Sequence, residues 1–174
     1  MNSSNAGICF GMCGDGLHVA FDGEATRHAS HAADRLICDY LTANHGSAKI
    51  VLDLGAVSYM DSTFAGWMLK LRRKMSELAG GSLSMSDCSE RCQRVLDGMQ
   101  IASLIQRQDV PRPEKTSRVA CRAGDLPERA LLELMASAHE ELASLDEQSR
   151  RVFGPIAEAL RKGLQEEDRR SPSH

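Results

Sequence analysis

The hydrophobic pattern changes period several times along the first part of the chain. Leu17, Val19 and Phe21 alternate with other residues, which is the period-two pattern of a short strand. Residues 25–43 carry apolar side chains at three- and four-residue steps, which predicts an amphipathic helix ended by Asn44-His45-Gly46. Residues 49–54 form a nearly continuous apolar run, typical of a strand buried on both faces. Such strands joined by a helix form a βαβ unit with parallel strands.

The same alternation continues through the middle of the chain. After the stretch YMDST, apolar residues at four- and three-residue steps from Phe64 to Leu78 predict a second helix, closed by Gly80-Gly81. Leu83 and Met85 alternate with serines in a third strand, and a short third helix follows the cap residues at 86–90. Residues 118–122 are predicted as a last strand. Residues 1–15 are expected to be irregular, and Asp22-Gly23 is interpreted as a turn.

The C-terminal part of the chain is strongly helical. Apolar residues from Leu131 to Leu145 step at four and three, and Pro127 suits the first helical turn. Ser144 with Glu147 predicts a capping box for another helix, which Gly154-Pro155 should kink or split. The tail from Asp168 is expected to fray. The apolar stripe of this segment must be buried on its own domain, within a hairpin, or in a dimer, and the pattern leaves these destinations open.

Alternating strands and helices predict an α/β sandwich, with a mixed sheet of four to five strands, helices packed on it and a C-terminal helical extension. The domain organisation follows the same pattern. Residues 1–15 are an irregular N-terminal segment, residues 16–143 are the α/β domain, and residues 144–174 are the helical extension with its polar tail.

Composition excludes several classes of function. The net charge of −3 argues against broad electrostatic binding to nucleic acid or anionic lipid, and no apolar run is long enough to span a bilayer. The N-terminus lacks the basic start and long apolar stretch of a secretory signal. Six scattered cysteines without CxxC spacing suit free thiols in a reducing cytoplasm. We therefore expect a cytoplasmic protein with neither metal nor cofactor.

Asp61-Ser62-Thr63 stands where an apolar strand runs into a helix. All three residue types are favoured helix caps, so plain capping explains the stretch on its own. A hydrolase that uses Ser62 as its nucleophile lacks the G-x-S-x-G elbow, so no enzyme is expected. Either the stretch is only a cap, or one of its hydroxyls carries the function.

The stretches VLDLGAVSYMDSTFAGWMLKL and GGSLSMSDCSERCQRVLDGMQIASLI resemble a STAS domain, specifically the bacterial anti-sigma factor antagonists. The resemblance covers roughly residues 15–122 and implies a STAS-like sandwich. It also implies partner switching in signal transduction and transcription regulation. Ser62 would be the phosphoacceptor of an anti-sigma factor that is a serine kinase of ATPase fold, and a PP2C-type phosphatase would remove the phosphate. The unmodified protein would bind the kinase. The implied partner-binding residues are Asp22, Gly23, Asp61, Thr63, Phe64, Trp67 and Ser89.

One residue departs from the family pattern. Glycine usually follows the DSS or DST triplet, whereas this chain has Phe64, which either begins the buried face of the helix or adds an apolar contact to the docking face. The departure keeps an alternative open, in which the chain is a STAS scaffold that is never phosphorylated, in a signalling or lipid-transport complex. A homodimer through the C-terminal helices is a further expectation.

Overall fold

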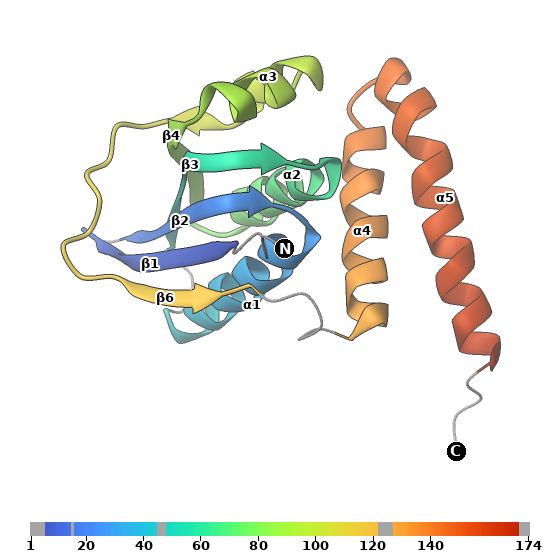
Figure 1. The fold of residues 1–174 in the computed structure, drawn as a ribbon, viewed down its shortest axis with the longest axis horizontal. Helices are drawn as coiled ribbons and strands as arrows, with labels where there is room; N and C mark the ends of the chain where they lie inside the picture. The colour runs from blue at the N-terminus through green and yellow to red at the C-terminus, as the bar shows by residue number, and fades with distance from the viewer. Residues whose placement is uncertain (1–5, 15, 45–47, 122–126, 171–174) are drawn as a thin grey trace, which may run out of the picture.

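The structure, a computed structural model, describes residues 6–14, 16–44, 48–121 and 127–170, and its centre is a mixed six-stranded sheet (Figure 1). The strand order is β5-β4-β3-β2-β1-β6. Strands β2 to β5 run parallel, while β1 is antiparallel to both of its neighbours. The predicted α/β sandwich with a mixed sheet and a C-terminal helical extension is confirmed, although the sheet has more strands than the four to five expected.

The elements follow one another in an alternating order. They are β1 (Gly7–Cys13), β2 (Gly16–Ala25), α1 (Arg27–Ala43), β3 (Lys49–Met60), α2 (Ser62–Glu77), β4 (Ser82–Cys88), α3 (Glu90–Gly98), the 3-10 turn η1 (Ala102–Leu104), β5 (Gln106–Arg107), β6 (Ser117–Ala120), α4 (Glu128–Ala143) and α5 (Glu147–Arg170). Helix α1 ends with Asn44 as its C-cap, whereas residues 45 and 46 of the predicted end lie outside the described residues. The same holds for residue 122 of the predicted last strand.

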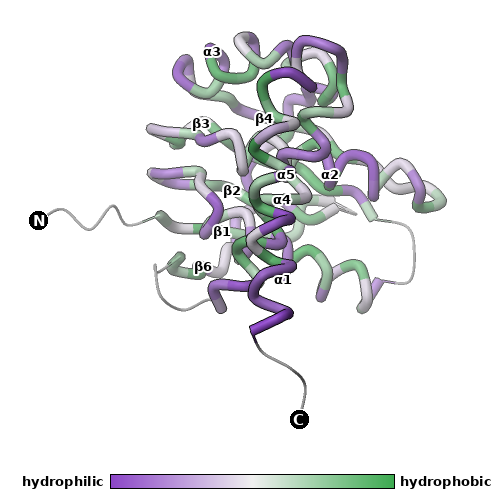
Figure 2. The backbone as a smooth tube through the Cα atoms, turned by 90° about the vertical axis from the view of Figure 1, so that its right-hand side faces the viewer, coloured by the Kyte–Doolittle hydropathy of each residue, from purple (hydrophilic) through white to green (hydrophobic). Residues whose placement is uncertain are grey.

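The hydrophobic core lies between the sheet and the helices α1 and α2, which cover one face of it (Figures 1 and 2). Central strand β3 points Ile50, Leu52 and Leu54 into this core, where all three are fully buried. Phe21 from β2 meets Phe64 from α2 edge to face, with ring centroids 4.9 Å apart. The core therefore fixes α2 directly on the strands that lead into it.

The expectation that residues 1–15 are irregular is wrong for Gly7–Cys13, which form strand β1. Ile8 and Phe10 alternate with smaller residues and pair with Phe21 and Val19 of β2. The glycines that obscured this pattern have a packing reason, because a side chain at Gly11 would collide with the carbonyl of Lys115 in the neighbouring loop. This strand and β6 together extend the sheet.

The interpretation of Asp22-Gly23 as a turn is also wrong, because β2 continues through both residues to Ala25. The pairing of β2 with β3 shifts register between Ala20 and Asp22 and again after Gly23, and Gly23 has a φ of 81°. A glycine with positive φ at such a shift is typical of a β-bulge. Asp22-Gly23 resembles a turn in sequence, but in the structure it forms a bulge that bends β2 without ending it.

The C-terminal helices α4 and α5 form an antiparallel hairpin across the end of the sheet, where the parallel strands have their carboxyl ends (Figure 1). Ion pairs from Arg161 to Glu140, at 2.6 Å, and from Arg129 to Asp168, at 2.5 Å, join the two helices. The expected fraying from Asp168 is wrong for residues 168–170, because α5 extends to Arg170. Residues 171–174 of the expected tail lie outside the described residues.

Two further expectations about the hairpin are wrong. Asp146, and not Ser144, caps α5, since its Oδ1 accepts a hydrogen bond of 2.7 Å from the Ser149 N–H, while Ser144 ends α4. Of the expected kink or split at Gly154-Pro155, the split is wrong, because α5 is continuous from Glu147 to Arg170. The missing N–H costs one helical hydrogen bond, but the ion pairs to α4 hold the helix beyond the proline.

On the opposite face of the sheet, a buried ion pair joins β3 to the loop that precedes β6. The Asp53 carboxylate, which is 1% exposed, accepts hydrogen bonds from Arg112 Nε at 2.7 Å and from the Gly55 N–H at 3.0 Å. His18 Nε2 lies 3.8 Å away, beyond hydrogen-bonding distance. Arg112 is therefore the main partner of the Asp53 carboxylate, which is shielded from solvent.

Replacing Arg112 by alanine should lower the free energy of unfolding by about 2 kcal/mol, because the buried Asp53 carboxylate loses its charged partner. Arg118 provides a matched control, since it is equally exposed but pairs with the exposed Asp22. Arg118→Ala should cost less than about 1 kcal/mol. Urea unfolding of both variants measures the difference, and equal losses would contradict the structural role of the Asp53–Arg112 pair.

Candidate functional site

The carboxyl ends of three parallel strands lie side by side beneath the C-terminal hairpin. The Asp61 N–H, just after β3, donates to the Ala25 carbonyl at the end of β2, at 3.1 Å. Ser89, just after β4, donates from its hydroxyl to the Val57 carbonyl of β3, at 2.7 Å. Helices α2 and α3 begin directly after these residues, so the strand ends hold two helix N-termini at the same edge.

Asp61 is the N-cap of α2. Its Oδ1 accepts a hydrogen bond of 2.8 Å from the Phe64 N–H. Burial raises the pKa of this carboxyl above its usual value, and the hydrogen bond from Phe64 opposes the rise only in part. Asp61 therefore fixes the first turn of α2 at an electrostatic cost.

Ser62, the first residue of α2, is half-buried and its hydroxyl is already engaged. Ser62 Oγ lies 3.0 Å from Nε2 of His139, a residue of α4 that is 4% exposed. The Nδ1 of His139 lies 2.7 Å from the Met135 carbonyl oxygen, which can only accept a hydrogen bond. The Nδ1 therefore carries a proton, and in the neutral ring Nε2 accepts the hydrogen bond that Ser62 donates.

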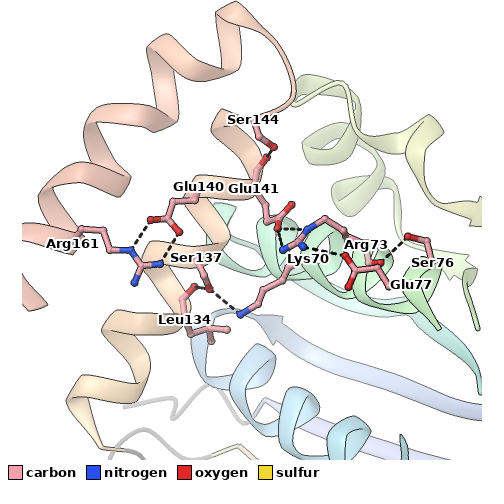
Figure 3. A network of polar contacts seen from close by, with 10 residues as sticks. All are labelled: Lys70, Arg73, Ser76, Glu77, Leu134, Ser137, Glu140, Glu141, Ser144 and Arg161. Atoms are coloured by element: carbon pink, nitrogen blue, oxygen red, sulfur yellow. Dashed lines mark hydrogen bonds and ion pairs between the residues drawn. The ribbon is translucent and has the colours of Figure 1, made fainter. Parts of the chain in front are cut away.

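The contact at Ser62 is one of four along a single face of α2, which we call the α4-facing stripe and define as Ser62, Gly66, Lys70 and Arg73. Each of the four residues meets α4. At Gly66 the two helix backbones touch, because a Cβ there would collide with the carbonyl of Ala138. Lys70 Nζ donates to Ser137 Oγ at 3.1 Å. Arg73 Nη2 lies 2.6 Å from Glu141 Oε1 (Figure 3).

Two residues expected in the docking surface point the other way. Phe64 and Trp67 are fully buried, so their assignment as partner-contact residues is corrected. Phe64 packs between Phe21 and Trp67, and the Trp67 indole N–H donates to Asp34 of α1 at 3.0 Å. The residue that replaces the family glycine therefore lies in the core and does not itself cover Ser62.

The remaining expected residues divide between framework and surface. Thr63 is buried in the first turn of α2, and Ser89 caps α3 by accepting a hydrogen bond of 3.3 Å from the Cys92 N–H. Asp22 is exposed and pairs with Arg118, while Gly23 forms the bulge beside it. Asp22 and Gly23 thus lie in β2, Thr63 in α2 and Ser89 at the start of α3. Of all the expected partner-binding residues, only Asp61 and Thr63 adjoin Ser62 in the chain.

Sequence reasoning missed His139, the residue in closest contact with the Ser62 hydroxyl. Its neighbours in the chain predict a helix, and no spacing relates it to Ser62, which is 77 residues away. It also missed the exposed Tyr59, which lines a hollow of about 360 Å³ beside Asp61 together with Arg27 and His28 of α1. The glycine at position 66 was the one available signal, since glycine inside a helix usually has a packing reason.

The Ser62–His139 pair is only part of the arrangement that a serine hydrolase needs. In a catalytic triad a carboxylate orients the histidine through Nδ1, whereas here Nδ1 faces the Met135 backbone carbonyl.

Within the described ranges, no group of three His, Cys, Asp or Glu side chains has a metal-binding arrangement. The six cysteines are unpaired. Among the helices that the structure describes, none is long and apolar enough to cross a membrane.

The fold and the strand–helix junction at Ser62 define the class of protein. The family model for the STAS domain matches residues 15–116, so this chain belongs to the STAS domain family. Among solved structures, the chain is similar to the unphosphorylated form of the anti-sigma factor antagonist SpoIIAA, with a TM-score of 0.50 and 17% sequence identity. The match covers 58% of this chain and 87% of SpoIIAA. No curated protein sequence matches. Helices α4 and α5 lie beyond the family match.

The burial of Asp61 predicts a pH-dependent contribution to stability. Its pKa is higher in the folded than in the unfolded chain, so its ionisation on raising the pH costs stability. Asp61→Asn should keep the cap and remove this dependence. The variant should therefore gain stability relative to the wild type as the pH rises from about 4, the unfolded value, through the raised pKa. Urea unfolding at several pH values measures the difference, and a constant difference would contradict the assignment.

Proposed function

We propose that this chain is a phosphorylation-regulated interaction module, similar in function to the anti-sigma factor antagonists. Ser62 is the phosphoacceptor, and the unmodified protein binds a partner-switching anti-sigma factor that is a serine kinase of ATPase fold. A PP2C-type phosphatase restores the unmodified state. The module has no catalysis of its own and acts in the cytoplasm. The observation that carries this proposal is the position of Ser62 at the start of α2, inside the segment that matches the family.

The physical chemistry of a helix N-terminus suits a phosphate at this position. The first N–H groups of α2 lack helical acceptors, and their partial positive charge favours an anion. A phosphate adds nearly two negative charges and three acceptor oxygens. The module itself therefore tolerates the modification, while a partner packed against this surface meets a desolvated, repelling charge. A penalty of about 1.4 kcal/mol already lowers partner affinity tenfold.

A second candidate function is a scaffold that is never phosphorylated, in a signalling or lipid-transport complex. The observation in its favour is the hydrogen bond between Ser62 and His139, which occupies the hydroxyl that a kinase needs. In both functions the surface around Ser62 is the binding surface. Mass spectrometry of the protein from its native cells distinguishes the two functions. Phosphate on Ser62 under any condition supports the regulated module, and its absence under all conditions supports the scaffold.

The outer face of the hairpin supports a proposed homodimer contact. Val152 and Ile156 lie one turn apart on α5 and are 54% and 42% exposed. A second copy of the chain that packs on this exposed face of α5 would bury both residues without touching the Ser62 site. Dimerisation and partner binding are therefore compatible.

Incubation with the cognate kinase and ATP should label the wild type at Ser62, whereas Ser62→Ala should not be labelled. Ser58 is the matched control, because it is an exposed serine four residues upstream whose hydroxyl contacts the Gly23 carbonyl at 3.1 Å. Ser58→Ala should be labelled as fully as the wild type. Radiolabel incorporation with peptide mapping measures the outcome, and full labelling of Ser62→Ala would show that the acceptor lies elsewhere.

A negative charge at position 62 should weaken binding to the kinase at least about tenfold. Ser62→Asp introduces that charge, and Ser62→Asn is a neutral control of the same shape, so the difference between them isolates the effect of charge. Titration calorimetry measures both affinities against the wild type. The switch is rejected if the two variants bind equally well.

A further inference from the structure

We infer that the α4–α5 hairpin is an autoinhibitory cover, which must leave α2 before a partner or kinase reaches Ser62. The hairpin comprises two helices that lie outside the family match, and it sits on the side of α2 that carries the Ser62 hydroxyl. The inference rests on the proposed function, because it concerns access to the same site. It adds a level of regulation that acts before phosphorylation.

The first argument is that the hairpin contacts the whole α4-facing stripe. All four of its members, spread over three turns at the start of α2, meet α4 through a hydrogen bond, an ion pair or direct backbone contact. Two protein surfaces cannot occupy this face together, because Gly66 brings the backbones into contact and leaves no space between them. A partner that docks on the start of α2 therefore competes with α4.

The second argument concerns the chemistry of phosphoryl transfer. The Ser62 oxygen must attack the γ-phosphorus of ATP, so that the Oγ–P bond forms while the bond from the γ-phosphorus to the β–γ bridging oxygen breaks. The hydroxyl proton passes to a base and ADP leaves. In this structure the hydroxyl is instead hydrogen-bonded to His139, whose ring is buried between Ser62, Met135 and Phe153 of α5. A kinase base and ATP cannot approach until His139 moves away.

The third argument is that the hairpin is built to detach as a unit. The ion pairs between α4 and α5 lie within the hairpin and survive its departure. Its contacts with the stripe are polar or involve glycine, and a hollow of about 580 Å³ lined largely by polar and charged side chains separates part of it from α1. Leu134 and Leu142 oppose release, because both are buried and join the domain core. Leu145 and Phe153 also pack against the core, and together these four apolar side chains keep the cover closed in the absence of a partner.

Accessibility of position 62 can be measured without any kinase. In the full chain, Ser62→Cys places a thiol beneath the cover, and the rate of its alkylation by iodoacetamide is followed by peptide mass spectrometry. Adding Gly66→Ala pushes α4 away through the collision with Ala138, while alanine suits the interior of α2 better than glycine. Gly163→Ala is the matched control, because it lies in α5 with open space around it.

We expect Gly66→Ala to raise the alkylation rate at position 62 about tenfold, whereas Gly163→Ala changes it less than about twofold. A second opening variant, Glu141→Arg, reverses the charge that faces Arg73, with the exposed Glu158→Arg as its control. The native buried Cys92 reports global unfolding and should stay protected in every variant. Equal rates at position 62 in opening and control variants would overturn the cover.

Kinase labelling at the native Ser62 separates this inference from the proposed function. Glu141→Arg leaves α2 unchanged, so faster labelling than in Glu158→Arg supports both the cover and the phosphoacceptor. If alkylation shows opening but no variant is labelled at Ser62, the cover stands and the proposed phosphorylation fails. If all variants are labelled and alkylated at the same rates, the phosphoacceptor stands and the cover fails.

Discussion

The close approach of α2 and α4 at Gly66 is the constraint on which the arrangement of the site depends. Because the glycine has no side chain, the carbonyl of Ala138 rests against the α2 backbone. This contact places His139 within 3.0 Å of Ser62 and Glu141 within 2.6 Å of Arg73. A side chain at position 66 would hold the helices apart and break these polar contacts together. The favourable packing offsets the roughly 1 kcal/mol by which glycine weakens a helix interior.

Two opposite faces of α2 thus have different tasks. The inner face, which includes Phe64 and Trp67, fastens the helix to β2 and α1 through aromatic packing and the hydrogen bond to Asp34. The outer stripe is polar or bare and suits a reversible contact, because its hydrogen bonds and ion pairs exchange readily with those to water or to another protein. The first turn, with Asp61 as its cap, keeps Ser62 at a fixed place whichever surface covers the stripe.

Much of the fold was predictable because burial imposes a period on the sequence. The strand ending before Asp61 and the helix from Ser62 follow from apolar spacing, and the DST block at their junction indicated the family. Strand β1 was missed because Gly7 and Gly11 hide its alternation, although Gly11 has a packing reason in the nearby Lys115 carbonyl. Asp22-Gly23 was misread because a bulge and a turn require the same positive φ. Local patterns report conformation, but they do not report which tertiary neighbour demands it.

The same limit explains why the cover was invisible in the sequence. Lys70 and Arg73 have the polarity of a solvent-facing helix surface, and His139 lies 77 residues from the serine it contacts. Periodicity showed that α4 and α5 must bury an apolar stripe, yet it left their own domain, a hairpin and a dimer open as destinations. The structure combines the first two, since the helices form a hairpin that lies on α2. Under the proposed function, a partner that binds at Ser62 must outcompete α4, which is permanently tethered to the same chain. Tethering makes α4 a strong competitor of the partner, because the effective concentration of a linked segment reaches the order of millimolar. In the proposed function, access to the Ser62 face therefore depends on two independent quantities, the charge on the Ser62 hydroxyl and the stability of the contact between α2 and α4.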